Sequence, residues 1–344
     1  MGPEIGALAP MTSRITASQE FIKGAGWGKA RQSLLAGDAS NRRYDRLTNS
    51  DGTTAVFMDA PADKGEDVRP FVRIAEFLIQ NGLSAPRILA QDPENGFLLI
   101  EDLGDALFAR LMVGAPDMTA PLYTAATDML VALHKAMPPD LPVCDTDWLV
   151  GMTDLAFDWY AQDKPALAEF DGFFRPLAEK LDQTARVVIL RDFHAENLLW
   201  LPDRSDVARV GVLDFQDALL GHPAYDLVSI LQDARRDVSP EIEAGMVAHY
   251  IAETDTDPAP FHTAYAVLGA QRNLRILGIF VRLCLRDGKA NYVSYIPRVW
   301  GYLQRNLDHP ALADLAEFVG KTLPNPSPDF LEDLKARCAT HPTP

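Results

Sequence analysis

Three oxygen-bearing side chains stand at a characteristic spacing in the second half of the chain. Asp192 and Asn197 lie in the segment LRDFHAENLLW, and Asp214 lies in GVLDFQD. This order of carboxylate, amide and second carboxylate is typical of phosphoryl transfer from a nucleotide to an alcohol. In that chemistry Asp192 accepts the proton of the acceptor hydroxyl, while Asn197 and Asp214 hold Mg²⁺ on the phosphates of ATP. We therefore predict a kinase that uses ATP and Mg²⁺.

The segments around these residues predict how they are positioned. VVILRD and VGVLDF have the apolar pattern of short strands, so we expect one strand–loop–strand unit over 187–215 with the loop at the strand end. The structural alternative is an Asx-rich loop that only caps itself. Asp226, in PAYDLVSI, begins a predicted helix after a turn, and we expect a buried cap or a bond back to the Asp192 loop.

A second candidate segment, AGDASNRRY at 36–44, falls between two predicted strands. Gly37 and Ser40 are small, so backbone N–H groups there can approach phosphate oxygens, and Arg42 and Arg43 add positive charge. The alternative is a plain hairpin with solvated arginines. The later strand FLLIED is expected to join two lobes, with backbone groups from Glu101 to Leu103 binding adenine.

Composition excludes several other classes of protein. The net charge of −16 argues against a general nucleic-acid binder. Three widely spaced cysteines without a CxxC pair argue against a zinc or disulfide framework. The longest apolar run, 265–285, contains Arg272, Arg275 and Arg282, so we interpret it as a buried core helix and expect neither a membrane span nor a membrane partner. We expect a cytoplasmic protein; protein partners are not predicted.

Periodicity changes near residue 104. The preceding residues are strand-rich, with a turn at Asn49–Gly52 and one strong helix over 67–80. The later residues are almost all helical in period. We predict an α+β, protein kinase-like bilobal fold, with a small β-rich nucleotide-binding lobe over 1–103. A large, mostly helical catalytic and substrate-binding lobe is predicted over 104–344.

The motifs LRDFHAEN, VLDFQDA and AYDLVSI resemble those of the aminoglycoside phosphotransferase and choline kinase family in order and spacing. The resemblance implies that Asp192 is the catalytic base and that Asn197 and Asp214 bind magnesium. Two positions depart from the family pattern. Leu190 replaces a usual His, and Met58 stands where the family has a phosphate-binding Lys. Arg42, Arg43 or Lys64 is the candidate substitute; without one, the chain is a nucleotide-binding pseudokinase.

A longer string of motifs is similar to the bacterial amino-sugar kinases of cell-wall recycling. These motifs are LAGDASNRRYDR, MDAP, LIEDLGD and LDFQDALLGHPAYDLVSILQDARRD. The resemblance implies transfer to the anomeric hydroxyl of N-acetylmuramate or N-acetylglucosamine, and it makes the missing Lys a subfamily trait. The alternative is an aminoglycoside or other small-alcohol kinase of the same fold, which the acidic balance also permits.

Three residues are candidates for binding the acceptor. Asp217 can hydrogen-bond sugar hydroxyls, and Arg235 and Arg236 can pair with the lactyl carboxylate of N-acetylmuramate. The alternative for the two arginines is a solvated helix end.

Overall fold

The computed structural model describes residues 9–37 and 41–341 of the protein. They form two compact units. The first combines the residues up to Arg110 with Asn197–Asp217, and the second combines Leu111–Glu196 with the residues from Ala218 onward. The chain thus changes unit within the predicted catalytic segment, between Glu196 and Asn197. None of the described helices has the length and apolarity that crossing a bilayer requires.

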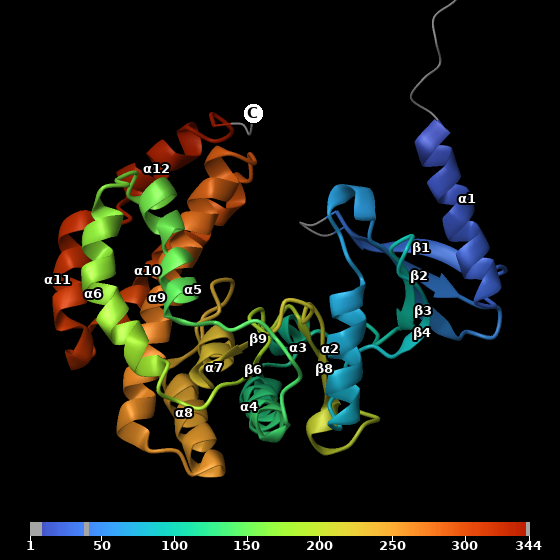
Figure 1. Cartoon of the computed structure of the whole chain (residues 1–344), viewed down its shortest axis with the longest axis horizontal. Helices are drawn as coiled ribbons and strands as arrows, with labels where there is room; N and C mark the ends of the chain where they lie inside the picture. The colour runs from blue at the N-terminus through green and yellow to red at the C-terminus, as the bar shows by residue number, and fades with distance from the viewer. Residues whose placement is uncertain (1–8, 38–40, 342–344) are drawn as a thin grey trace, which may run out of the picture. The chain divides into compact units, whose positions relative to one another are not determined.

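The first unit is built on an antiparallel sheet with the strand order β1-β2-β3-β5-β4 (Figure 1). Its strands are β1 (Arg31–Gly37), β2 (Arg43–Thr48), β3 (Thr54–Asp59), β4 (Ile88–Asp92) and β5 (Phe97–Glu101). The predicted turn between β2 and β3 is confirmed, because Gly52 donates its N–H to the carbonyl of Asn49 and has a φ of 87°. Glycine adopts this left-handed conformation without steric cost.

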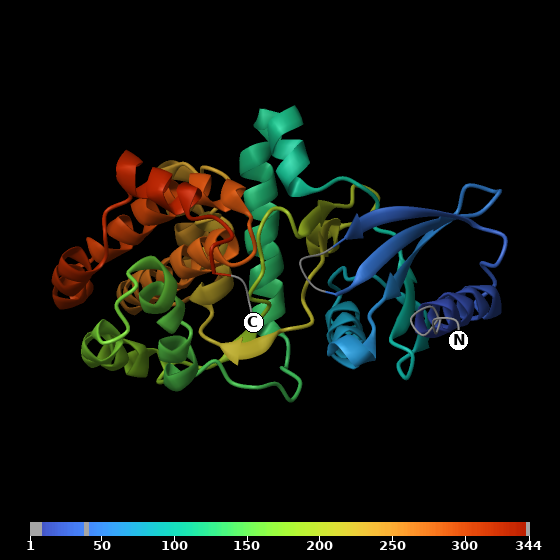
Figure 2. The ribbon, with the colours of Figure 1, turned by 90° about the horizontal axis from the view of Figure 1, so that it is seen from above.

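Two helices pack with this sheet. The α1 helix (Ala9–Gly24) places Phe21 against Phe57 and Phe97, with ring centroids 5.7–6.0 Å apart, and it lies alongside the strands in Figure 2. The α2 helix (Arg69–Gln80) buries the four predicted apolar positions, namely Phe71, Ile74, Phe77 and Leu78. The ring of Phe71 also contacts Phe215, the residue after Asp214, with centroids 4.7 Å apart. Helix α2 therefore supports the segment that carries one predicted metal ligand.

A two-stranded sheet completes the first unit. Strand β7 (Leu198–Trp200) pairs antiparallel with β8 (Val210–Val212). The N–H of Trp200 donates to the carbonyl of Ala106, and the N–H of Val212 donates to that of Ser84, both at 2.8 Å. These bonds fix the strands whose ends carry Asn197 and Asp214.

The second unit is mostly helical, and α9 is its longest helix. The helices are α4 (Thr119–Lys135), α5 (Thr146–Gly151), a π-helix (Ala156–Tyr160), α6 (Ala166–Leu181), α7 (Ala224–Leu231), α8 (Pro240–Thr254), α9 (Pro258–Leu285), α10 (Ile296–Leu307), α11 (Ala313–Thr322) and α12 (Pro328–Ala336). A further helix, α3 (Phe108–Gly114), contains the boundary between the units. A Cβ at Gly278 of α9 would lie 2.2 Å from the backbone of Leu155, so the π-helix region packs directly on the α9 backbone.

The two strands predicted around the Asp192 loop are present, but they belong to different sheets. Strand β6 (Val187–Ile189) pairs antiparallel with β9 (Leu219–Gly221) in the second unit, whereas β8 pairs with β7 in the first. The segment 187–215 therefore contains the two predicted strands, and an additional strand, β7, follows the Asp192 loop. Each three-residue strand has another short apolar strand as its partner, and sequence alone does not distinguish these pairings.

Asp226 in α7 fixes the backbone in front of Asp192. Its side chain is fully buried and accepts the N–H of Leu190 at 2.6 Å and that of Arg191 at 2.9 Å. The predicted bond from Asp226 to this loop is confirmed. Burial raises the pKa of Asp226 to about 7, and the two N–H donors act in the opposite direction.

A cavity of about 830 Å³ lies within the second unit and is lined by residues that include His134, His222, Tyr250 and Phe261. His134 Nδ1 is 2.7 Å from the Tyr250 hydroxyl, and His222 Nδ1 accepts the N–H of Ala224 at 3.1 Å. Burial lowers the pKa of His134 to about 3 and that of His222 to about 4. Both imidazoles are therefore neutral in the folded protein near neutral pH.

We expect the free energy of unfolding to decrease as the pH falls from about 6.5 towards 4. The unfolded chain takes up protons on these histidines near pH 6.5, whereas the folded chain does not until the pH is lower. His222→Asn keeps an acceptor for the N–H of Ala224. It should reduce the slope of the free energy of unfolding against pH by up to about 1.4 kcal/mol per pH unit. Urea unfolding at several pH values measures the free energy of unfolding and hence this slope. His262→Asn, at an exposed histidine, is the control, and equal slopes for all proteins would contradict the prediction.

Asp226→Asn should destabilise the protein by about 1–3 kcal/mol, because the new amide donor faces a buried backbone N–H that loses its acceptor. Turnover should fall as well, since the turn before Asp192 loses its support. Urea unfolding and kinetics measure the two effects. Asp237→Asn is the matched control, because that side chain is 84% exposed. An Asp226→Asn protein with unchanged stability would be inconsistent with this role.

Candidate active site

The loop that carries Asp192 is a tight, strained turn in the second unit. Arg191 has a φ of 71°, a left-handed conformation that is uncommon for residues other than glycine. The N–H of Asp192 donates to the carbonyl of Leu190 at 2.9 Å, and that of His194 donates to the carbonyl of Asp192 at 3.1 Å. Asp192 itself is half-buried. Strain held by surrounding bonds is typical of functional loops, and here it orients the predicted base.

The first unit brings Asn197 and Asp214 together. Asn197 Nδ2 donates to Asp214 Oδ2 at 3.4 Å, and the N–H of Leu213 donates to the Asn197 carbonyl at 2.9 Å. Asp214 is exposed and has a φ of 56°, again left-handed. Its other oxygen accepts from Gln216 Nε2 at 2.8 Å. The sequence analysis did not identify Gln216; its position two residues after Asp214 was the available signal.

These side chains fit a magnesium ion. Mg²⁺ prefers oxygen ligands and usually takes only one or two protein groups, with substrate phosphates and water completing its coordination. The half-buried Asn197 and the exposed Asp214 supply such oxygens. Within the described residues no group of three or more His, Cys, Asp and Glu side chains forms a metal cluster.

The predicted phosphate-binding arginines both pair with carboxylates. Arg42 Nε is 2.7 Å from Glu66, and each of these side chains is only 12% exposed. Arg43 Nε is 2.9 Å from the buried Asp45. Gly37 ends β1, and Ser40 lies outside the described residues. Arg42 is thus not a plain solvated side chain of a hairpin, whereas the Arg43 side chain is 61% exposed.

Met58 and its possible substitute, Lys64, lie in different settings. Met58 is 1% exposed in β3, so an apolar side chain fills the position of the usual Lys. Lys64 ends a short 3₁₀ helix, and its carbonyl accepts from Asn41 Nδ2 at 3.3 Å. This bond connects the segments around Arg42 and Lys64.

The segment after β5 is held by ion pairs. Glu101 pairs with Arg87 at 3.1 Å and with Arg204 at 2.8 Å, and its N–H donates to the Arg87 carbonyl. Asp102 pairs with Arg46 at 2.6 Å. Among the described residues no hydrogen bond engages the backbone N–H or carbonyl of Leu103. The backbone groups of Leu103 are therefore unused among these residues, whereas those of Glu101 are partly used.

Of the acceptor-site candidates, both arginines contact the Asp192 loop. Arg235 is exposed, with Nη1 3.4 Å from His194 Nε2. Arg236 is 15% exposed and pairs with Asp233 at 3.2 Å and with Glu196 at 3.3 Å. A solvated helix end therefore does not describe Arg236. Asp217 is exposed and belongs to the first unit.

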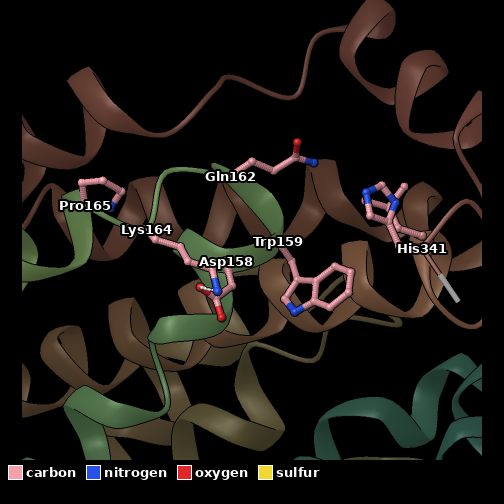
Figure 3. Close-up of a pocket in the computed structure, with 7 residues that line it drawn as sticks. Asp158, Trp159, Gln162, Lys164, Pro165 and His341 are labelled. Atoms are coloured by element: carbon pink, nitrogen blue, oxygen red, sulfur yellow. Dashed lines mark ion pairs between the residues drawn. The ribbon is translucent and has the colours of Figure 1, made fainter. Parts of the chain in front are cut away.

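A smaller hollow of about 500 Å³ lies beside the π-helix (Figure 3). Trp159 and His341 line it, with ring centroids 6.5 Å apart, and Lys164 pairs with Asp158 at 3.3 Å. None of the predicted catalytic, metal-binding or acceptor-binding residues lines this hollow or the 830 Å³ cavity.

Comparison with known proteins agrees with this chemistry. Residues 31–262 match the model of the phosphotransferase enzyme family. A Caulobacter vibrioides protein named N-acetylmuramate/N-acetylglucosamine kinase is 40% identical, with 91% of this chain and 98% of that protein covered. A Pseudomonas aeruginosa protein of the same name is 35% identical, covering 87% and 92%.

A solved structure shows the fold. The structure of a choline/ethanolamine kinase family protein from Mesorhizobium loti has a TM-score of 0.60 at 12% identity, and covers 95% of this chain and 99% of that one. The predicted fold, with a small sheet-containing part and a larger helical part, is confirmed. The chain belongs to the phosphotransferase enzyme family, and it is a kinase with the protein kinase-like fold.

Proposed function

We propose that this kinase transfers the γ-phosphoryl group of ATP to the anomeric hydroxyl of N-acetylmuramate and N-acetylglucosamine, as part of cell-wall recycling. The observation that carries the substrate assignment is the 31–40% identity to four proteins named as kinases of these two sugars. Such identity extends over at least 83% of this chain, so it includes acceptor-binding as well as catalytic segments.

The catalytic roles follow from the chemistry of the side chains. Asp192 accepts the proton of the sugar hydroxyl and orients that oxygen towards the phosphorus. Asn197 and Asp214 hold Mg²⁺, with Gln216 fixing the rotamer of Asp214. Magnesium supplies positive charge that neutralises the phosphate oxygens. The chain's contribution is thus mainly positioning and electrostatic stabilisation.

The nucleotide is assigned to the first hundred residues. The segment from Gly37 to Arg43, which includes Ser40, is proposed to bind its phosphates, and the backbone from Glu101 to Leu103 its adenine. The unused backbone groups of Leu103 and the exposed guanidinium of Arg43 support this. The nucleotide-binding lobe is accordingly assigned to 1–103 and the catalytic lobe to 104–344.

The acceptor is assigned to residues after the catalytic loop. Asp217 is proposed to hydrogen-bond sugar hydroxyls, and Arg235 to contact the acceptor because it is exposed beside His194. Arg236 already pairs with two carboxylates. Its proposed role is to hold Glu196 and thereby the loop, rather than to bind the lactyl carboxylate.

A cationic acceptor is the second candidate, favoured by the net charge of −16. Turnover of ATP with N-acetylmuramate, N-acetylglucosamine, kanamycin and choline, with mass detection of the products, distinguishes the candidates. An acid-labile phosphorylated N-acetyl sugar supports the anomeric assignment. Transfer only to kanamycin or choline refutes it, and ATP binding without transfer to any acceptor favours a pseudokinase.

Asp192→Asn should lower kcat by at least about 100-fold, because the amide cannot accept the hydroxyl proton. Affinity for ATP should change little. Steady-state kinetics and calorimetric titration with Mg·ATP measure the two effects, and Asp203→Asn, at an exposed carboxylate, is the control. Turnover like that of the wild type would refute the role of Asp192.

Gln216→Leu should raise the Mg²⁺ concentration for half-maximal activity by about 10–100-fold, because a ligand that loses its outer partner is less well oriented. Titration of activity with Mg²⁺ at saturating ATP measures this concentration. Gln183→Leu, distant in sequence, is the control. An unchanged Mg²⁺ requirement would show that Gln216 does not support the ligand.

A further inference from the structure

Two arginines of α9 are enclosed without a carboxylate partner. Arg272 is 8% exposed, and Nε of both Arg272 and Arg275 is buried without a hydrogen-bond partner. Within the described part of the chain, neither guanidinium has a carboxylate within 4.0 Å. Among the residues that the structure describes, the Arg275 side chain makes one hydrogen bond, from Nη1 to the Tyr225 hydroxyl at 3.5 Å.

Such an arrangement is costly for the folded protein. Removing a cation from water without pairing it is unfavourable, and most buried charges are therefore paired. Two other enclosed arginines follow that rule, since Arg42 pairs with Glu66 and Arg236 with Asp233. Arg272 and Arg275 depart from it, which suggests that their partner is an anionic group brought by a ligand.

The two arginines belong to a cluster next to the catalytic loop within the second unit. They are three positions apart on α9 and so share one face of the helix. The guanidinium carbon of Arg275 lies 6.0 Å from the ring centre of Trp148, and that of Arg191 lies 5.4 Å from it. Arg191 precedes Asp192 directly. Burial lowers the pKa of Arg275; Tyr225 and Asp192 act in the opposite direction, and the charges of Arg191 and Arg272 lower it further.

We infer that Arg272 and Arg275, with Trp148 beside them, form a subsite that binds the carboxylate of an anionic acceptor sugar. This inference rests on the proposed function, because N-acetylmuramate carries a lactyl carboxylate that N-acetylglucosamine lacks. A guanidinium presents paired N–H donors that match the two oxygens of a carboxylate. Since both arginines occupy the unit that contains Asp192, the subsite belongs to the acceptor rather than to the predicted adenine segment.

The test compares kcat/KM for the two sugars in wild type, Arg272→Met and Arg275→Met. The ratio of N-acetylmuramate to N-acetylglucosamine should fall by about 10–100-fold in each variant, because each loses a charged hydrogen-bond donor to the carboxylate. The Tm of Arg272→Met without substrate should equal or exceed that of the wild type, because an unpaired buried charge has been removed. Arg272→Lys should lower the ratio too, since an ammonium lacks the paired donors.

Arg286→Met is the matched control. Arg286 ends the same helix, but its Nε is paired with Asp287 at 2.7 Å, so the ratio should remain that of the wild type. An unchanged ratio in both methionine variants would overturn the inference. Equal losses for the two sugars, together with a lower Tm, would also overturn it by showing a purely structural role. Should a methionine variant fail to fold, the kcat/KM ratio of the two sugars in Arg272→Lys tests the inference: a lowered ratio supports it, and an unchanged ratio overturns it.

A binding measurement separates this inference from the proposed function. If the wild type phosphorylates neither sugar, the proposed function fails. Calorimetric titration with N-acetylmuramate then tests the subsite independently of turnover. Binding by the wild type that is lost in Arg275→Met and kept in Arg286→Met supports the subsite. Absence of binding to the wild type refutes it.

Discussion

The active site depends on one buried carboxylate that accepts two backbone hydrogen bonds. Asp226 receives the N–H groups of Leu190 and Arg191, and this holds the left-handed turn that presents Asp192. Without it, two enclosed N–H donors would lack partners, which costs far more than an ordinary surface hydrogen bond contributes. Helix α7 carries this carboxylate, and strand β6, paired with β9, leads into the loop that the carboxylate holds.

Most features that the sequence predicts correctly follow from a recognisable local pattern. The four apolar anchors of α2 follow from helical spacing, and the positive φ of Gly52 follows from a turn motif. The bond from Asp226 to the catalytic loop was predicted as well, because an acidic residue at the start of an apolar helix needs donors nearby. The fold class follows from the change in periodicity near residue 104. The helix and the turn need only a few adjacent residues, whereas Asp226 lies 36 positions from Leu190 and the fold class draws on the pattern of the whole chain.

The features that the sequence does not reveal depend on distant partners. Strand β6 and strand β8 are both three-residue apolar runs, so their true partners are not encoded in periodicity. Arg42 and Arg236 look like available cations until Glu66 and Glu196 are found beside them, 24 and 40 positions away. The assigned roles of Asp192, Asn197 and Asp214 stay predictions, whereas the contacts around them are structural facts.

Helix α9 is at once the longest helix of the second unit and the source of the enclosed arginines. If those arginines select the acceptor, the residues that determine acceptor choice lie in the packed interior rather than in a surface loop that could be replaced. Evolution of a new acceptor range would then proceed through substitutions that also alter folding stability. Laboratory selection for thermostability would in turn tend to broaden or shift the acceptor range, so directed evolution of this enzyme would have to follow both properties together.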